Sequence, residues 1–231
     1  MLQKADLMNR KIYAVFVAGG SGTRMGGSIP KQFLEIGGIP VLQRTIESFT
    51  KACPEASVIV VLPSEHIELW KELCRRNALN CPQTIVEGGM TRFHSVKNAL
   101  AKVPDGAIVS IHDGVRPFAG KTLIRTMIEK MSECDALVPA LPVVDSLKYR
   151  DGTLPEPDRS SILAVQTPQM FRSELLKKAY KQAYRESFTD DASVAARDGV
   201  KISYTDGEKF NIKITTPEDL KLAEFLISSG L

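Results

Sequence analysis

The sequence predicts an α/β fold built on a doubly wound, mainly parallel β-sheet. Short apolar runs rich in β-branched residues alternate along the chain with segments whose apolar residues recur at helical spacing. The first run, residues 12–17, is continuously apolar, which is typical of a strand that helices cover on both faces. Because a helix that joins two neighbouring strands makes a right-handed crossover, this alternation implies parallel strands.

The patterns place the elements in order. Residues 41–49 carry Val41, Ile46 and Phe49 on one helical face, so this helix should return the chain to the start of the next strand. Thr216 is expected to cap the last helix, with Pro217 at its first position. The expected strands are 12–17, 57–62, 83–87, 107–111, 136–142 and 201–204, and the expected helices are 41–49, 64–73, 91–102, 121–131, 174–184, one opening at Thr189 as cap and one opening at 216.

The alternation of strand and helix patterns stops between residues 142 and 166. Apolar and polar residues there surround a turn at Asp151-Gly152, which predicts short strands forming a hairpin that projects from the sheet. An isolated hairpin is marginally stable, so we expect a single domain of residues 1–231 that forms a homodimer through this β-arm. A flexible surface hairpin on a monomer remains the alternative.

A glycine-rich stretch directly follows the first predicted strand and contains Gly19, Gly20 and Gly22. Residues without a Cβ let backbone N–H groups approach an anion closely. Arg24 and Lys31 add two positive charges to the same stretch. The pattern therefore predicts a phosphate-binding site, and its cations suit the charge that develops on phosphate oxygens during group transfer.

Two well-known phosphate-binding loops fit this stretch poorly. A mononucleotide P-loop needs Ser or Thr directly after its lysine, but Gln32 follows Lys31. The dinucleotide pattern G-x-G-x-x-G fits only at its first two glycines, because Met25 occupies the third position and no acidic residue ends a second strand about 20 residues further on. A glycine turn that merely packs a helix on a strand would leave Arg24 and Lys31 unexplained.

The composition excludes several classes of protein. The 231 residues have a net charge of +3 and no basic run of the kind that binds nucleic acid. Residues 1–10 lack the apolar core of a signal peptide, and no apolar run approaches the ~20 residues that cross a membrane. The four cysteines and three histidines show no metal-ligand spacing. We therefore expect a cytoplasmic protein with reduced thiols, no nucleic-acid or membrane partner and no metal site of its own.

Polar motifs also follow two later predicted strands. Residues 88–95 (GGMTRFHS) come after the third strand, and residues 112–117 (HDGVRP) come after the fourth. In open α/β sheets, ligands bind beyond the carboxyl ends of the strands, near the switch in strand order. Asp113 would there hold magnesium, bind ligand hydroxyls or cap the turn, whereas His112 is expected to be structural.

The glycine stretch belongs to a series of blocks that run through nearly the whole chain. The blocks are AGGSGTRMG, PKQFL, GG-x-x-R-x-x-SV, HDGVRP, QTPQMF, TDDAS and NIKITTPEDL. The first resembles nucleotidyltransferases that activate small phosphates or sugars, and PKQFL narrows the resemblance to cytidylyltransferases. In order and spacing the series is similar to the 2-C-methyl-D-erythritol 4-phosphate cytidylyltransferases of the non-mevalonate isoprenoid pathway. The resemblance implies a Rossmann-like nucleotidyltransferase sheet, a dimerisation arm and transfer of CMP from CTP to the acceptor phosphate.

The resemblance also implies roles for individual residues. Arg24, Lys31 and Lys213 would be catalytic, with the first two gripping the triphosphate. The positions implied for CTP are Ala18, Gly19, Gly20, Gly22, Gly89 and Ser95. The positions implied for the polyol phosphate are Asp113, Arg116, Ser146, Arg159, Thr167 and Thr189. Because Arg159 falls in the expected arm, it would reach the site of the partner subunit.

Transfer of CMP to a phosphate needs no general base, since the second pKa of a phosphate monoester is about 6 and the acceptor is largely ionised at neutral pH. Catalysis then consists of holding two anions together, with Mg²⁺ or another divalent cation held mainly by the CTP phosphates.

Three other functions remain open at this point. A ribitol 5-phosphate cytidylyltransferase shares most blocks; Arg92, Ser95 and TDDAS favour the methylerythritol enzyme, whereas Val115 and Phe118 favour the ribitol enzyme. A non-catalytic nucleotide-binding module would be expected to lack Lys31 or Lys213. A dinucleotide-dependent oxidoreductase is the weakest alternative.

Overall fold

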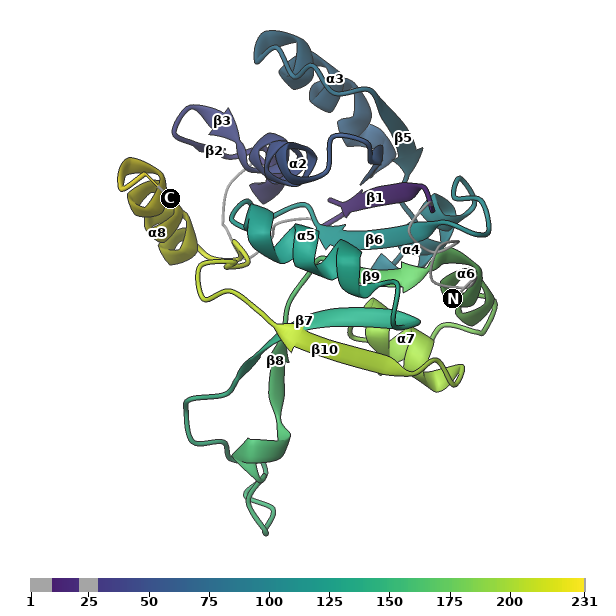
Figure 1. Cartoon of the computed structure of the whole chain (residues 1–231). Helices are drawn as coiled ribbons and strands as arrows, with labels where there is room; N and C mark the ends of the chain where they lie inside the picture. The colour runs from purple at the N-terminus through teal and green to yellow at the C-terminus, as the bar shows by residue number, and fades with distance from the viewer. Residues whose placement is uncertain (1–9, 21–28, 231) are drawn as a thin grey trace.

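The computed structural model describes residues 10–20 and 29–230, and within these residues eight strands form one sheet (Figure 1). The strand order is β10-β7-β9-β6-β1-β4-β5, and β8 pairs with β7 off this path. The strands are β1 (Ile12–Val17), β4 (Ser57–Leu62), β5 (Gln83–Glu87), β6 (Ile108–Asp113), β7 (Ala136–Pro142), β8 (Leu163–Val165), β9 (Gln169–Arg172) and β10 (Ile202–Asp206). A separate small sheet pairs β2 (Glu35–Ile36) with β3 (Ile39–Pro40).

The expected doubly wound, mainly parallel sheet is confirmed. Strands β1, β4, β5 and β6 pair in parallel, as do β7 and β10, whereas β9 lies antiparallel between β6 and β7. The register places Val17 beside both Val61 and Asp113. The carboxyl ends of β1, β4 and β6 therefore lie at one edge of the sheet.

Helices cover both faces of the sheet. They are α2 (Val41–Ala52), α3 (Ile67–Arg76), α4 (Arg92–Leu100), α5 (Lys121–Lys130), α6 (Ser173–Ala179), α7 (Asp191–Arg197) and α8 (Pro217–Ser228), with short 3₁₀ turns η2 (Lys31–Phe33), η3 (Ser64–His66) and η4 (Arg159–Ser161). Along β1, Ala14 and Phe16 pack with α2, α3 and α5, whereas Val15 packs with α4, α6 and α7. This two-sided burial explains the continuously apolar β1 sequence.

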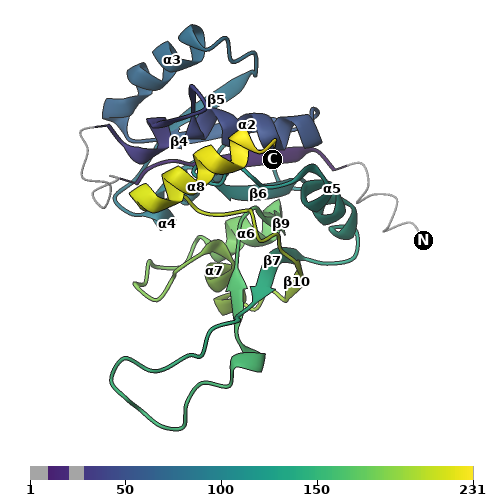
Figure 2. The same ribbon diagram turned by 90° about the vertical axis from the view of Figure 1, so that its left-hand side faces the viewer.

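The segment between β7 and β8 projects from the rest of the molecule in both views (Figures 1 and 2). It turns at Asp151-Gly152 as expected, with the Gly152 N–H donating to Tyr149 O at 3.1 Å and Gly152 at φ +74°. The expectation of strands around this turn is wrong, because β7 and β8 pair only at the base of the arm, from Ala140 to Pro142. Prolines at 155 and 157 remove the backbone donors that such a ladder would need.

None of the helices within the described part of the chain combines the length and apolar character needed to cross a bilayer.

Candidate active site

A cleft of about 390 Å³ lies at the carboxyl-end edge of the sheet. Its lining comes from the segment after β1, the segment after β5, the end of β6 and the loop before α8. This is the location expected for a ligand site in an open α/β sheet.

The start of the glycine-rich stretch forms one wall of the cleft. Ala18 N–H donates to Val61 O at 3.0 Å, and Ala18 O accepts the side-chain N–H of buried Gln32 at 2.8 Å. Lys31, only 9% exposed, has its stem beside Gly20, where an added Cβ would lie 3.9 Å from Lys31 Cε. Backbone amides and a lysine thus share this wall. The sequence did not predict the part of Gln32, whose side chain fixes the Ala18 carbonyl.

The turn between β5 and α4 forms a second wall. The Gly89 N–H donates to Ser95 Oγ at 3.0 Å, and that hydroxyl donates to Thr91 O at 3.0 Å. A Cβ on Gly89 would lie 2.4 Å from His94 Cβ, so only glycine fits this close turn. The cleft therefore meets a rigid turn made of backbone and one small hydroxyl.

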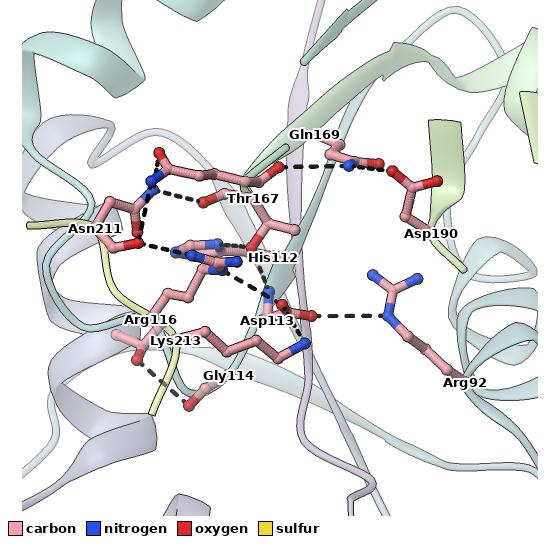
Figure 3. A network of polar contacts seen from close by, with 12 residues as sticks. Arg92, His112, Asp113, Gly114, Arg116, Thr167, Gln169, Asp190, Asn211 and Lys213 are labelled. Carbon is pink, nitrogen blue, oxygen red and sulfur yellow. Dashed lines mark hydrogen bonds and ion pairs between the residues drawn. The ribbon is translucent and has the colours of Figure 1, made fainter. Parts of the chain in front are cut away.

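Asp113, the last residue of β6, is the centre of a charge cluster at the floor of the cleft (Figure 3). Its Oδ2 lies 2.9 Å from Lys213 Nζ and 3.4 Å from Arg116 Nε, and its Oδ1 lies 3.7 Å from Arg92 Nε. Three cations from three separate segments of the chain therefore meet one carboxylate.

Electrostatics keep this carboxylate charged. Burial alone would raise the pKa of Asp113, but the charges of Arg92, Lys213 and Arg116 outweigh burial and hold that pKa well below its ordinary range. Burial lowers the pKa of Arg116, and Asp113 opposes that shift. Asp113 thus carries a full negative charge at neutral pH, and its oxygens are occupied by cations.

Arg92 also forms an ion pair with a second carboxylate, that of Asp191. Its Nη2 lies 2.6 Å from Oδ2 of the fully buried Asp191, whose Oδ1 accepts the Tyr180 hydroxyl at 2.6 Å. Burial alone would lower the pKa of Arg92, but Asp191 and Asp113 raise it. Arg92 therefore remains charged and points at the cleft in a fixed orientation.

The start of α7 differs from the sequence-based expectation. Asp190, not Thr189, caps the helix: its Oδ1 accepts the Ser193 N–H at 2.8 Å, and Ser193 Oγ completes a capping box. A carboxylate at this position is as good a cap as threonine, and Gln169 also donates to it at 2.8 Å. Asp191, the next residue, faces inward to Arg92.

Behind Asp113, a network of neutral polar groups fixes the end of β6 (Figure 3). The Thr167 hydroxyl accepts the Asp113 N–H at 3.0 Å and pairs with His112 Nδ1 at 2.9 Å. The Asn211 side-chain amide donates to Thr167 O at 2.9 Å, and the Asn211 backbone carbonyl accepts a hydrogen bond from Arg116 Nη1 at 2.7 Å. Burial lowers the pKa of His112 to about 3, so this imidazole is neutral and has a structural role, as expected.

The cleft brings together many of the expected site residues. The lining includes Ala18, Gly19, Gly20, Lys31, Gly89, Ser95, Asp113 and Lys213. Arg116 joins them through Asp113, whereas the Thr167 side chain lies behind the cleft in the neutral network. The predictions for Gly22 and Arg24 fall outside the described residues.

Three expected residues lie away from this lining. Ser146 and Arg159 are exposed in the arm, where Arg159 Nη1 donates to Val144 O at 2.7 Å. Thr189 is exposed just before α7. Their assignment to the substrate stays a prediction.

Sequence reasoning missed Arg92, Asp191 and Gln32 as parts of the site. All three occur within the sequence blocks, Gln32 in PKQFL, Arg92 in GG-x-x-R-x-x-SV and Asp191 in TDDAS, so motif membership was the available signal. As for metal ligands, no group of three His, Cys, Asp or Glu side chains that could hold an ion occurs in residues 10–20 and 29–230.

Known proteins share both the sequence and the fold. The model of the 2-C-methyl-D-erythritol 4-phosphate cytidylyltransferase family matches residues 12–229. The chain belongs to this family. The family protein of Phocaeicola vulgatus is 46% identical over 222 residues, which cover 95% of this chain and all of that protein.

Two solved structures confirm the fold. The 4-diphosphocytidyl-2C-methyl-D-erythritol synthase of Anaerococcus prevotii superposes with a TM-score of 0.82 at 27% identity, covering 97% of this chain and 99% of that one. The 2-C-methyl-D-erythritol 4-phosphate cytidylyltransferase of Thermus thermophilus gives a TM-score of 0.74 at 30% identity, covering 94% and 99%. This chain is therefore a family member over nearly its full length.

Proposed function

We propose that this chain transfers CMP from CTP to the phosphate of 2-C-methyl-D-erythritol 4-phosphate, releasing pyrophosphate and forming 4-diphosphocytidyl-2-C-methyl-D-erythritol. Family membership over residues 12–229 supports the reaction. The observation that carries it in the structure is the convergence of the glycine stretch, Lys31 and the Asp113 cluster on one cleft. Such a site suits two phosphate-bearing substrates that must approach each other.

The reaction proceeds without a protein base. The acceptor phosphate has a second pKa of about 6, so at neutral pH its oxygen already carries the charge needed for attack on the α-phosphate. His112, the titratable group nearest Asp113 along the strand, is buried and neutral, and its Nδ1 is committed to Thr167. The remaining barrier is the repulsion between two anions and the charge that builds up as pyrophosphate leaves.

Fixed cations lower this barrier. Lys31 beside the glycine stretch is placed to meet the triphosphate. Arg24, which follows the same glycines in the sequence, is proposed to bind the triphosphate as well. Lys213 and Arg116 converge through Asp113, and they are placed to meet the acceptor phosphate; arginine can bind it with two N–H groups. Because Asp113 already holds these cations in place, little reorganisation is needed when charge develops.

The Gly89–Ser95 turn is proposed to receive the cytosine and ribose, because a wall of backbone and small residues leaves room for a pyrimidine but not for a purine. A divalent cation, Mg²⁺ or a similar ion, is proposed to enter as part of the CTP substrate and to neutralise part of its phosphate charge.

A homodimer is proposed to form through the arm of residues 142–166. The arm exposes large apolar side chains, with Val144 77% and Leu154 75% exposed. Its β-strand pairing within the chain, between β7 and β8, is at the base of the arm. Apolar side chains on a projecting segment are stabilised when a second copy covers them. In this arrangement, Ser146 and Arg159 would approach the cleft of the partner.

The protein is proposed to work in the cytoplasm. All four cysteines are free thiols, which is the state maintained by a reducing compartment.

The test is a pyrophosphate-release assay with CTP, Mg²⁺ and one acceptor at a time. Turnover with methylerythritol phosphate, at least a hundredfold above that with ribitol 5-phosphate, is expected. The reverse preference would make the chain a ribitol phosphate enzyme. Binding of CTP without pyrophosphate release from either acceptor would make it a nucleotide-binding module.

A further inference from the structure

A second cavity, of about 570 Å³, lies apart from the cleft and shares no lining residue with it. Its apolar lining includes Phe118 from the segment before α5, Phe210 from the loop after β10 and Ile227 from α8. Helix α2 supplies the remaining wall. The volume is in the range of about 300–1,000 Å³ that small organic ligands occupy in proteins.

The lining of this cavity contains more cations than acids. The cations are Arg44, Lys51 and Lys209, and the acids are Glu47 and Glu208. Both acids accept from neutral donors, Glu208 from the Gly120 N–H at 2.7 Å and Glu47 from the Gln43 amide at 2.8 Å. Lys51 and Lys209 are exposed and form no ion pair with the described residues. An apolar hollow whose cations outnumber its acids suits a ligand that is apolar over most of its surface and carries one anionic group.

One loop runs from the lining of this cavity to the charge cluster. The loop that contributes Glu208 and Phe210 continues, three residues later, to Lys213. Gln166 holds this loop by donating to Glu208 O at 2.8 Å and by accepting the Glu208 N–H at 3.1 Å. A ligand that displaces Phe210 would therefore pull on the backbone that positions Lys213 against Asp113.

We propose that this cavity is a regulatory site for a small amphipathic anion, an aromatic or branched apolar body bearing one sulfonate, carboxylate or phosphate. An occupant that displaces Phe210 moves this loop, disturbs the 2.9 Å contact between Lys213 Nζ and Asp113 Oδ2, and so slows cytidylyl transfer. The site is separate from those of CTP and the acceptor.

The probe is 1-anilinonaphthalene-8-sulfonate, an aromatic sulfonate whose fluorescence rises on binding. It is titrated into the full-length protein with CTP present to fill the cleft. The double variant Lys51→Glu/Lys209→Glu should bind the probe at least tenfold more weakly. The matched control Lys102→Glu/Lys201→Glu changes the net charge equally at exposed positions outside the cavity and should bind it normally.

A second variant removes the space instead of the charge. Ile227→Trp should abolish the saturable signal, and denaturant unfolding shows whether this variant keeps its fold. Turnover of the wild type should fall at least threefold at saturating probe, whereas Lys51→Glu/Lys209→Glu should keep its basal turnover and lose this response. Equal probe affinity in all these proteins, or probe binding with unchanged wild-type turnover, would overturn the proposal.

Discussion

Asp191→Asn tests whether a buried carboxylate holds Arg92 in the site. The substitution keeps the shape of the side chain but leaves Arg92 with only Asp113, at 3.7 Å. Removing one partner of a buried ion pair costs about 3–5 kcal/mol of the free energy of unfolding. Because Arg92 is 30% exposed, we expect the lower end, about 3 kcal/mol.

The assay is thermal unfolding followed by circular dichroism, beside a matched control. For a chain of 231 residues, about 3 kcal/mol lowers the midpoint by about 6–12 °C. Asp190→Asn makes the same chemical change at the adjacent position, where asparagine still caps α7 and only the Gln169 contact is weakened, so it should cost about 1 kcal/mol. Equal midpoint losses for the two variants would refute the assignment of Asp191 as the anchor of Arg92.

Three further predictions follow from the site. Lys213→Ala should lower the rate of pyrophosphate release by about 10²–10³, because it removes one prepositioned cation; Lys201→Ala should leave the rate unchanged, and a loss under threefold for Lys213→Ala would contradict the catalytic role. Gly89→Ala should raise the KM for CTP at least tenfold, since its Cβ would lie 2.4 Å from His94 Cβ, and an unchanged KM would place the nucleotide elsewhere. His112→Asn should make stability less sensitive to acid: the pKa of His112 is about 3 when folded against 6.5 ordinarily, so the unfolded wild type gains a proton that the folded form does not as pH falls below about 6.5. The free energy of unfolding of the wild type should thereby fall by about 2 kcal/mol by pH 5. Denaturant titrations at several pH values measure this fall, and an equal dependence on pH in the variant would exclude His112 as the cause of the acid sensitivity.

The central sheet could be predicted because its strands are long, apolar and β-branched. Strand β9 carries no such pattern, since Gln169–Arg172 has only two apolar residues, and it forms because β6 and β7 offer it partners on both sides. The arm shows the opposite case. An Asp-Gly turn is a good local signal for a hairpin, but local sequence could not show that strand pairing would stop at Pro142.

Candidate site residues could be predicted where a residue type suited to phosphate binding directly follows a predicted strand. Gly19, Gly20, Lys31 and Asp113 follow predicted strands, so the geometry of a parallel sheet was enough to bring them together. The Arg92–Asp191 pair could not be deduced in this way. The two residues are 99 positions apart, and each lies at the start of a helix, where a charged residue is ordinarily expected to face solvent.

The surroundings of Asp113 indicate a role as a counter-charge. Lys213, Arg116 and Arg92 all face this carboxylate in the described structure. Two unit charges 4 Å apart interact by about 4 kcal/mol at an effective dielectric constant of 20, so three clustered cations would repel each other strongly without a counter-charge. Asp113 offsets this repulsion and lets the cations be fixed before the phosphates arrive. Its negative charge should therefore matter more than its hydrogen-bonding capacity, and Asp113→Asn should impair the site even though it keeps an oxygen acceptor.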